Sequence, residues 1–210
     1  KKFNNINCEL DIIPMVGWKR EMFWNDTNLP WVPPSPNLPT SDGAIIFPGT
    51  VLFEGTNISE GRGTTRSLEI IGHPKIEPFS FLEEITPKIQ TWNLEGISLR
   101  PITFLPTFQK HKDIPCGGFQ IHITDHKKLL SWRMGQFLLQ ELFHYLKGEF
   151  KWNDRPYEYE FEGLAIDFIN GSKKMRNWVE KNQGIEDLND IEKEGLQKFL
   201  SQRDQILIYE

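Results

Sequence analysis

Chemically active side chains gather in one short stretch of the chain. Residues 55–65, with the sequence GTNISEGRGTT, combine three glycines with an amide, a carboxylate, a guanidinium and several hydroxyls. We call this stretch the signature loop. Its glycines allow backbone conformations closed to other residues, and its polar groups supply the donors and acceptors that a polyhydroxylated ligand requires. The composition fits a sugar-binding loop, and it equally fits an ordinary surface loop.

A phosphate-binding loop is an alternative that the spacing argues against. In the Walker pattern a lysine and a serine or threonine follow the second glycine. Here Arg62 and Gly63 follow Gly61, and five residues separate Gly55 from Gly61, one more than that pattern has. We therefore do not expect a nucleotide-binding loop.

Two carboxylates could do acid–base chemistry in this region. Glycosidases place two carboxyl groups across the scissile bond, and Glu54 and Glu60 stand six positions apart. Glu54 directly follows the apolar run 51–53, so it could be a structural acceptor for backbone N–H groups. Glu60 lies deeper in the loop and is our candidate for a catalytic residue and a ligand contact. The spacing alone does not decide the geometry.

Composition excludes several classes of partner. The formal net charge is −5 and the pI is about 5.6, so no basic stripe for nucleic acid is expected. No apolar run is long enough to span a membrane. The two cysteines, Cys8 and Cys116, lack the spacing of a metal or redox motif. We expect no metal, no cofactor, no nucleic-acid partner and no membrane span.

Hydrophobic periodicity predicts an α+β fold, a mixed β-sheet flanked by helices. The clearest strand is 117–124, where apolar and polar residues alternate. The longest helix is predicted at 126–147, capped by Asp125, ended by Gly148 and covering a sheet. The other predicted strands are 9–16 (buried), 43–53 (a turn and a strand) and 99–108; the other helices are 78–92 (shortened or kinked at Pro87), 171–181 and 185–203; residues 206–209 are a closing strand or an extended tail.

Prolines make residues 29–40 a stiff, extended segment, because proline fixes φ and disfavours helical geometry in the preceding residue. The segment could be an interdomain linker. It could also be a rigid wall that presents Ser35 and Asn37 to a ligand beside the signature loop. We favour the wall because of the family resemblance described next.

Several motifs together resemble the NamZ-type exo-β-N-acetylmuramidases, a two-domain family of peptidoglycan glycosidases long known only as a domain of unknown function. The resemblance covers nearly the whole chain. It rests on 30–40 (PWVPPSPNLPT), 48–50 (PGT), 54–65 (EGTNISEGRGTT), 104–111 (FLPTFQKH), 116–125 (CGGFQIHITD), 156–160 (PYEYE), 166–167 (ID), Arg203 and Tyr209.

The resemblance implies a domain organisation. Family members begin with a Rossmann-like domain, which is thought to hold the main catalytic carboxylate. We expect residues 1–20 to be the last strand and linker of that domain, and residues 21–210 to be the C-terminal α+β domain. The missing N-terminal domain is then an expected partner, and the full-length protein is expected to be periplasmic or secreted.

The resemblance also implies a ligand, a muramic-acid-containing saccharide. Arg62 could grip the lactyl carboxylate of N-acetylmuramic acid through two parallel hydrogen bonds. It could equally brace the loop by pairing with Glu54, Glu60 or Glu69. Lys110 is a second cationic candidate, and His122, which could simply be structural, lies on the polar face of its strand. The full set of candidate substrate contacts is Ser35, Asn37, Asn57, Glu60, Arg62, Thr64, Lys110 and His122.

Two functions remain open at this stage. In the first, the chain is the C-terminal domain of an exo-acting β-N-acetylmuramidase that releases N-acetylmuramic acid from peptidoglycan fragments, and the chain alone is inactive. In the second, it is a non-catalytic carbohydrate-binding or scaffold module.

Overall fold

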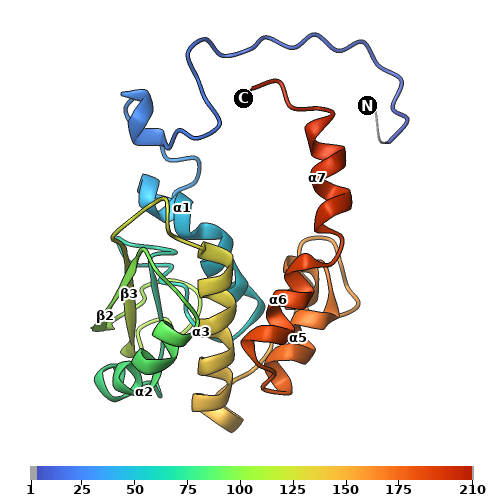
Figure 1. The fold of residues 1–210 in the computed structure, drawn as a ribbon. Coiled ribbons are helices and arrows are strands. Elements are labelled where there is room, and N and C mark those ends of the chain that lie inside the picture. The colour runs from blue at the N-terminus through green and yellow to red at the C-terminus, as the bar shows by residue number, and fades with distance from the viewer. Residues whose placement is uncertain (1–3, 210) are drawn as a thin grey trace. The chain divides into compact units, whose positions relative to one another are not determined.

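A computed structural model describes residues 4–209 (Figure 1). The chain divides into two compact units, one formed by residues 31–194 and the other by 4–30 with 195–209. The larger unit contains α1 (Ser41–Thr50), η2 (Val51–Gly55), β1 (Ile70–His73), α2 (Pro78–Thr91), β2 (Ile97–Phe104), β3 (Cys116–Ile123), α3 (Ser131–Leu146), η3 (Lys147–Glu149), α4 (Ala165–Ile169), α5 (Lys173–Glu180) and α6 (Ile185–Lys193); the smaller contains η1 (Trp24–Thr27) and α7 (Leu196–Asp204).

The sheet has three strands in the order β1-β3-β2, and both pairings are antiparallel. The α+β class is therefore confirmed, while the expected mixed sheet is wrong for the residues described. The strands predicted at 99–108 and 117–124 are confirmed as β2 and β3. Alternation on β3 is also confirmed, since Phe119 and Ile121 are buried and His122 is exposed.

Helix α2 packs against β2 and β3 (Figure 1). Its Phe81 ring stacks on Phe119 of the central strand, with centroids 5.5 Å apart. The Glu77 side chain caps the helix by accepting from the backbone N–H of Ser80. Pro87 lies inside α2 without ending it, and the helix runs one residue short of the predicted boundary.

Helix α3 is the longest helix of the described chain, as predicted, but it begins at Ser131 and not near residue 126. Asp125 is not its N-cap; the Asp125 carboxylate instead accepts from the backbone N–H of Lys127 in a preceding turn. The helix approaches α1, α5 and η2 most closely, and its buried face belongs to the same hydrophobic core as the sheet residues Phe119 and Ile121.

The α1–α3 crossing brings two backbones into direct contact. A Cβ built on Gly49 would lie 2.0 Å from the carbonyl oxygen of Ser131, and one built on Gly135 would lie 2.2 Å from the carbonyl oxygen of Gly49. The Ser131 hydroxyl accepts from the Gly49 N–H and donates to the Ile46 carbonyl. Only glycine allows helices to approach this closely.

The strand predicted at 43–53 is wrong, because these residues form α1 and η2. Thr40 starts α1 by accepting the Gly43 N–H at 2.9 Å, which is ordinary N-cap geometry. Pro48 lies within the helix, and Ser131 supplies hydrogen bonds on either side of it. The proline and glycines concealed a helix that tertiary contacts stabilise.

The smaller unit also differs from expectation. Residues 9–16 have no regular secondary structure, pair with no strand of the described chain and are exposed, so the buried strand predicted there is not formed within residues 4–209. The Met15 N–H donates to the Tyr209 hydroxyl at 2.6 Å, and the rings of Trp18 and Tyr209 meet edge to face at 4.8 Å. Residues 206–209 form a tail without strand pairing.

The helix predicted at 185–203 is two helices, α6 and α7. Gly195 stands between them with a φ of 72°, a left-handed conformation that ends regular helix geometry. The helix predicted at 171–181 is confirmed as α5, where the Ser172 side chain accepts the Lys174 N–H.

Across residues 4–209, no helix combines the length and apolar character needed to cross a membrane.

Candidate functional site

Backbone hydrogen bonds fix the signature loop on two sides. Ser59 exchanges two bonds with Gly72 of β1, at 2.8 and 2.9 Å. On the other side, Thr56 forms an isolated bridge with Trp152, and the Asn57 N–H donates to the Lys151 carbonyl at 2.9 Å. The loop is therefore a bound part of the fold, held between β1 and the segment that follows α3.

A pocket of about 820 Å³ opens over this loop. We call it the loop pocket. Four of the predicted contact residues line it together. The lining consists of Glu54, Thr56, Asn57, Glu60, Arg62, Gln109, Lys110, His111, Lys151, Trp152, Asn153, Asp154, Arg155 and Tyr157.

A buried ion pair forms part of the pocket floor. The Glu60 side chain is 2% exposed, and its Oε2 accepts from Lys110 Nζ at 2.8 Å. The same ammonium donates to the carbonyls of Phe53 and Ile58, at 2.7 and 3.1 Å. Burial lowers the pKa of Lys110, and the charge of Glu60 opposes that shift. An ammonium has three N–H donors, so Lys110 has none left for a ligand.

Arg62 joins the two carboxylates of the pocket. Its Nε donates to Glu60 Oε1 at 2.9 Å, and its Nη2 donates to Glu54 Oε1. Burial disfavours the guanidinium charge, but the hydrogen bonds and charges of Glu54 and Glu60 outweigh this and raise the pKa of Arg62. This is the pairing expected of a loop brace, one of the two roles that the sequence left open.

Glu54 is the more accessible carboxylate, with 20% of its side chain exposed. Its Oε2 accepts the Tyr157 hydroxyl at 3.3 Å, and its backbone carbonyl accepts the Asn153 amide at 3.1 Å. Burial raises the pKa of Tyr157 to about 12, and the Glu54 charge acts in the same direction. Tyr157 therefore stays protonated and donates to Glu54 at neutral pH.

The Asn57 side chain pins the loop to the segment after α3. Its Nδ2 donates to the Glu149 carbonyl at 2.8 Å, and its Oδ1 accepts the Lys151 N–H at 2.9 Å. His73 Nε2 lies 3.3 Å from the same Nδ2, and His111 Nε2 donates to the Asn57 carbonyl at 2.7 Å. Asn57 thus lies in the pocket wall with its side chain already hydrogen-bonded on both ends.

His73 is buried behind Asn57, 4% exposed, with its ring edge to face against His111 at 4.7 Å. Burial lowers the pKa of His73 to about 4, and repulsion from His111 contributes in the same direction. Its Nδ1 accepts the Lys75 N–H at 3.2 Å. The ring is therefore neutral at physiological pH.

The backbone around Lys110 is strained. Gln109, His111 and Asp113 have φ values of 62°, 54° and 59°, in the left-handed region that residues with a Cβ rarely occupy. Such conformations persist where the surrounding structure fixes them, and they concentrate at functional sites. Here they direct Lys110 beneath the signature loop, between two residues that line the pocket.

Four predicted contact residues lie outside the pocket lining. The Ser35 hydroxyl accepts the Asn37 N–H at 3.3 Å, and the Asn37 carboxamide accepts from Ser67 at 3.5 Å. The Thr64 hydroxyl donates to the Gly61 carbonyl at 2.6 Å within the loop, and His122 is exposed on β3. Their roles as substrate contacts stay predictions.

Sequence reasoning missed most of the pocket's other wall, residues 151–155. The Asn153 N–H donates to the Gly55 carbonyl at 2.8 Å, which places this segment beside the loop. Nothing in its sequence indicated the pairing, because the partner lies almost a hundred residues away. Tyr157, from the motif 156–160, also lines the pocket.

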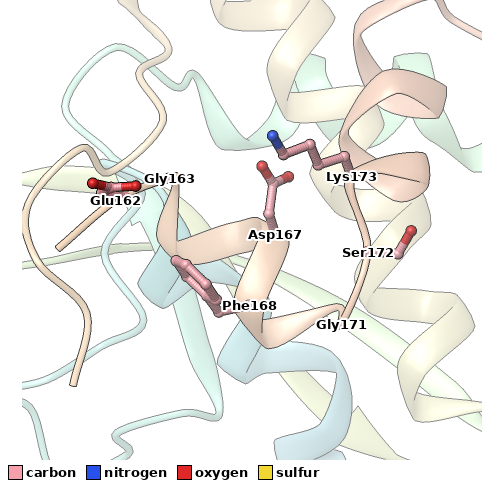
Figure 2. A pocket seen from close by; sticks show the side chains of 7 residues that line it. All are labelled: Glu162, Gly163, Asp167, Phe168, Gly171, Ser172 and Lys173. Carbon is pink, nitrogen blue, oxygen red and sulfur yellow. The ribbon is translucent and has the colours of Figure 1, made fainter. Parts of the chain in front are cut away.

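A second pocket, of about 600 Å³, lies at α4 and the start of α5 (Figure 2). Among its three charged residues, Asp167 is 8% exposed and accepts from Arg176 Nε and Nη2 at 2.9 and 3.1 Å. Figure 2 shows Phe168 and Lys173 around the same opening. Arg176 therefore neutralises the buried carboxylate of this pocket, and its other two charged residues, Glu162 and Lys173, are exposed.

Residues 4–209 contain no group of three or more histidine, cysteine, aspartate or glutamate side chains arranged to hold a metal ion. Cys116 is buried, and burial raises the pKa of its thiol to about 11.

The fold places the chain in a class of solved proteins. A DUF1343 family protein from Bacteroides fragilis superposes with a TM-score of 0.76 at 22% identity, covering 92% of this chain and 49% of that one. A second DUF1343 family protein from the same organism gives a TM-score of 0.57 at 24% identity, covering 85% of this chain and 44% of that one. These likenesses define the fold.

Family models identify the chain further. The model "Exo-beta-N-acetylmuramidase NamZ, C-terminal" matches residues 45–209, and the N-terminal model of the same family matches residues 1–42. The chain belongs to the NamZ exo-β-N-acetylmuramidase family. It is 35% identical over 210 residues to the peptidoglycan β-N-acetylmuramidase NamZ of Bacillus subtilis. The match covers all of this chain and 47% of that relative, so the chain spans about half of the relative's length.

Proposed function

We propose that this chain is the C-terminal domain of an exo-acting β-N-acetylmuramidase, a glycoside hydrolase that releases N-acetylmuramic acid from peptidoglycan fragments. The observation that carries the proposal is the loop pocket, in which the family's signature residues Glu54, Glu60 and Arg62 form one ion-paired network. The family match over residues 45–209 supports it.

Within the pocket, Glu54 and Glu60 have different proposed roles. Glu60 is our sequence-based catalytic candidate, but it is 2% exposed and held by two cations, which favours a positioning role. Glu54 is partly exposed and receives a hydrogen bond from Tyr157, so it is better placed to touch a sugar. Glycosidases need a second carboxyl group across the scissile bond, and we propose that the N-terminal domain supplies it.

The N-terminal domain is the proposed partner of this chain. Residues 1–42 match the N-terminal family model, and residues 1–20 are proposed to be its last strand and linker. Large apolar side chains of this segment are exposed, with Ile13 at 93% and Val16 at 102%. Apolar residues exposed in such density are normally covered by another surface. We propose that the rest of that domain covers them.

The proposed localisation follows from the substrate. Peptidoglycan lies outside the cytoplasmic membrane, so the full-length protein is proposed to be periplasmic or secreted. Fractionation of the source cells, followed by immunodetection, tests this proposal.

Turnover of a chromogenic N-acetylmuramide by the full-length protein and by residues 1–210 tests the activity. We expect release of N-acetylmuramic acid by the full-length protein and none by the shorter chain. Absence of turnover by the full-length protein, together with tight muramic-sugar binding by residues 1–210, would instead favour a carbohydrate-binding module. Robust turnover by residues 1–210 would contradict the proposed role of the N-terminal domain.

A further inference from the structure

Four charges at the floor of the loop pocket neutralise one another. Glu60 contacts both Lys110 and Arg62, and Arg62 also contacts Glu54. Two carboxylates and two cations sum to zero. The floor therefore presents hydrogen-bonding groups to a ligand but little net charge.

Arg62 is a poor receptor for a further carboxylate. It already faces Glu54 and Glu60, and its side chain is only 19% exposed. A ligand carboxylate at Arg62 would approach the partly exposed carboxylate of Glu54, and like charges at short distance repel each other. A charged substituent on the substrate needs a cation elsewhere.

The other wall of the pocket provides two such cations. Lys151 and Arg155 line the pocket and are exposed, and neither forms an ion pair with any residue in 4–209. Asp154 is the single acidic residue on this stretch of the lining. The segment thus carries a net positive charge facing a neutral floor.

The backbone that carries these cations is fixed to the signature loop. Lys151 is held through both its N–H and its carbonyl by Asn57. The Arg155 N–H donates to the Asn153 side chain at 3.2 Å, and that side chain donates to the Glu54 carbonyl. The backbone from which the two cations extend is therefore fixed relative to Glu54, as it would not be in a flexible surface loop.

We propose that Lys151 and Arg155 recognise a carboxylate carried by the substrate and thereby select muramic sugars over neutral ones. This inference rests on the proposed function. The carboxylate has two possible sources, the lactyl group of the sugar itself or a peptide joined to that group. Arg155 can form two parallel hydrogen bonds to a carboxylate, and Lys151 adds a point charge.

The test uses the full-length enzyme and three chromogenic glycosides. These are an N-acetylmuramide with a free lactyl carboxylate, its neutral methylamide, and the same sugar carrying a short acidic peptide. We expect the Lys151→Met, Arg155→Met double variant to lose about tenfold in kcat/KM for the glycoside whose carboxylate is recognised. Its turnover of the neutral methylamide should be unchanged. The charged glycoside whose turnover falls identifies whether the lactyl carboxylate or the peptide is recognised.

Lys173→Met is the matched control, because it removes one exposed cation beside the α4 pocket. It should leave all three rates unchanged. Equal rate losses on charged and neutral glycosides, or no loss in the double variant, would overturn the proposal. If the wild-type enzyme turns over none of the glycosides, the proposed function fails, and titration of residues 1–210 with sodium N-acetylmuramate decides the recognition. Equal affinity of wild type and double variant would then reject it.

Discussion

The floor of the loop pocket and its rim, which is the wall formed by residues 151–155 and Tyr157, are built in opposite ways. At the floor and in the adjoining signature loop, Glu60, Lys110 and Asn57 have their hydrogen-bonding groups occupied by the protein. At the rim, Lys151 and Arg155 are exposed and pair with no acidic residue of the described chain. Groups that are already paired hold a shape, whereas unpaired groups are available to a ligand. The paired residues belong to the family motifs 54–65 and 104–111, whereas Lys151 and Arg155 lie outside every motif named above.

The largest expected effect is at the buried cation of the floor. Lys110→Met leaves Glu60, which is 2% exposed, without its ammonium partner. Breaking a buried pair from one side costs about 3 kcal/mol, and urea unfolding of residues 1–210 measures the loss. Lys112→Met is the control, because Lys112 is 62% exposed and its nearest carboxylate is 3.9 Å away. Equal stability of both variants would show that the floor is not a stabilising network.

The second effect appears as a dependence of stability on pH. The folded-state pKa of His73 is about 4, below the ordinary histidine value of 6.5. The unfolded chain therefore binds a proton that the folded protein does not, and the contribution of His73 to stability is complete above pH 6.5. It falls as the pH decreases from 6.5 to 4, by up to about 3 kcal/mol.

His73→Gln should remove this slope from urea unfolding measured between pH 7 and 4.5. His122→Gln, at an exposed histidine on β3, is the control and should retain it. A slope that survives in the His73 variant would assign the pH dependence to other groups.

A smaller loss is expected at the asparagine that joins the loop to the opposite wall. Asn57→Ala removes a donor to Glu149 and an acceptor for Lys151, which costs about 2 kcal/mol in unfolding free energy. Asn177→Ala, at an exposed position of α5, should change stability by less than about 0.5 kcal/mol. If both substitutions lower the unfolding free energy equally, the hydrogen bonds of Asn57 do not stabilise the contact between the loop and the opposite wall.

The smallest effect is expected at the rim. Tyr157→Phe removes one hydrogen bond of 3.3 Å to Glu54, so the expected loss is below about 1 kcal/mol. Thermal unfolding measures it, with the Asn57 variant as the reference. A loss as large as that of Asn57→Ala would place Tyr157 in the stabilising network and weaken the distinction between floor and rim.

Local sequence patterns predicted the parts of the fold that depend on local periodicity. Strand β3 was evident because buried Phe119 and Ile121 alternate with polar neighbours. Strand β1 was missed because its four residues are all buried and show no alternation. Helix α1 was mistaken for a strand because it contains Pro48, which normally interrupts a helix. The hydroxyl of Ser131, more than eighty residues later in the chain, supplies hydrogen bonds to the α1 backbone beside this proline.

The location of the candidate site could be predicted from the sequence, but not which of its side chains are already hydrogen-bonded within the protein. The density of polar groups in residues 55–65 indicated the pocket wall correctly, since Asn57, Glu60 and Arg62 all line it. Whether each side chain is occupied depends on partners distant in sequence, such as Lys110 for Glu60 and Lys151 for Asn57. Such pairings leave no pattern within the motif itself.

The crossing at Gly49 and Gly135 has a consequence for how the pocket tolerates change. An added Cβ at either position would meet mainly backbone atoms, which cannot rotate away as a side chain can. Any substitution must therefore push the backbones of α1 and α3 apart. Since η3 and the segment 150–155 follow directly from α3, separation would draw the cationic wall away from the signature loop. In a library of single variants, these two glycines should rank among the positions least open to replacement, although neither lines the pocket.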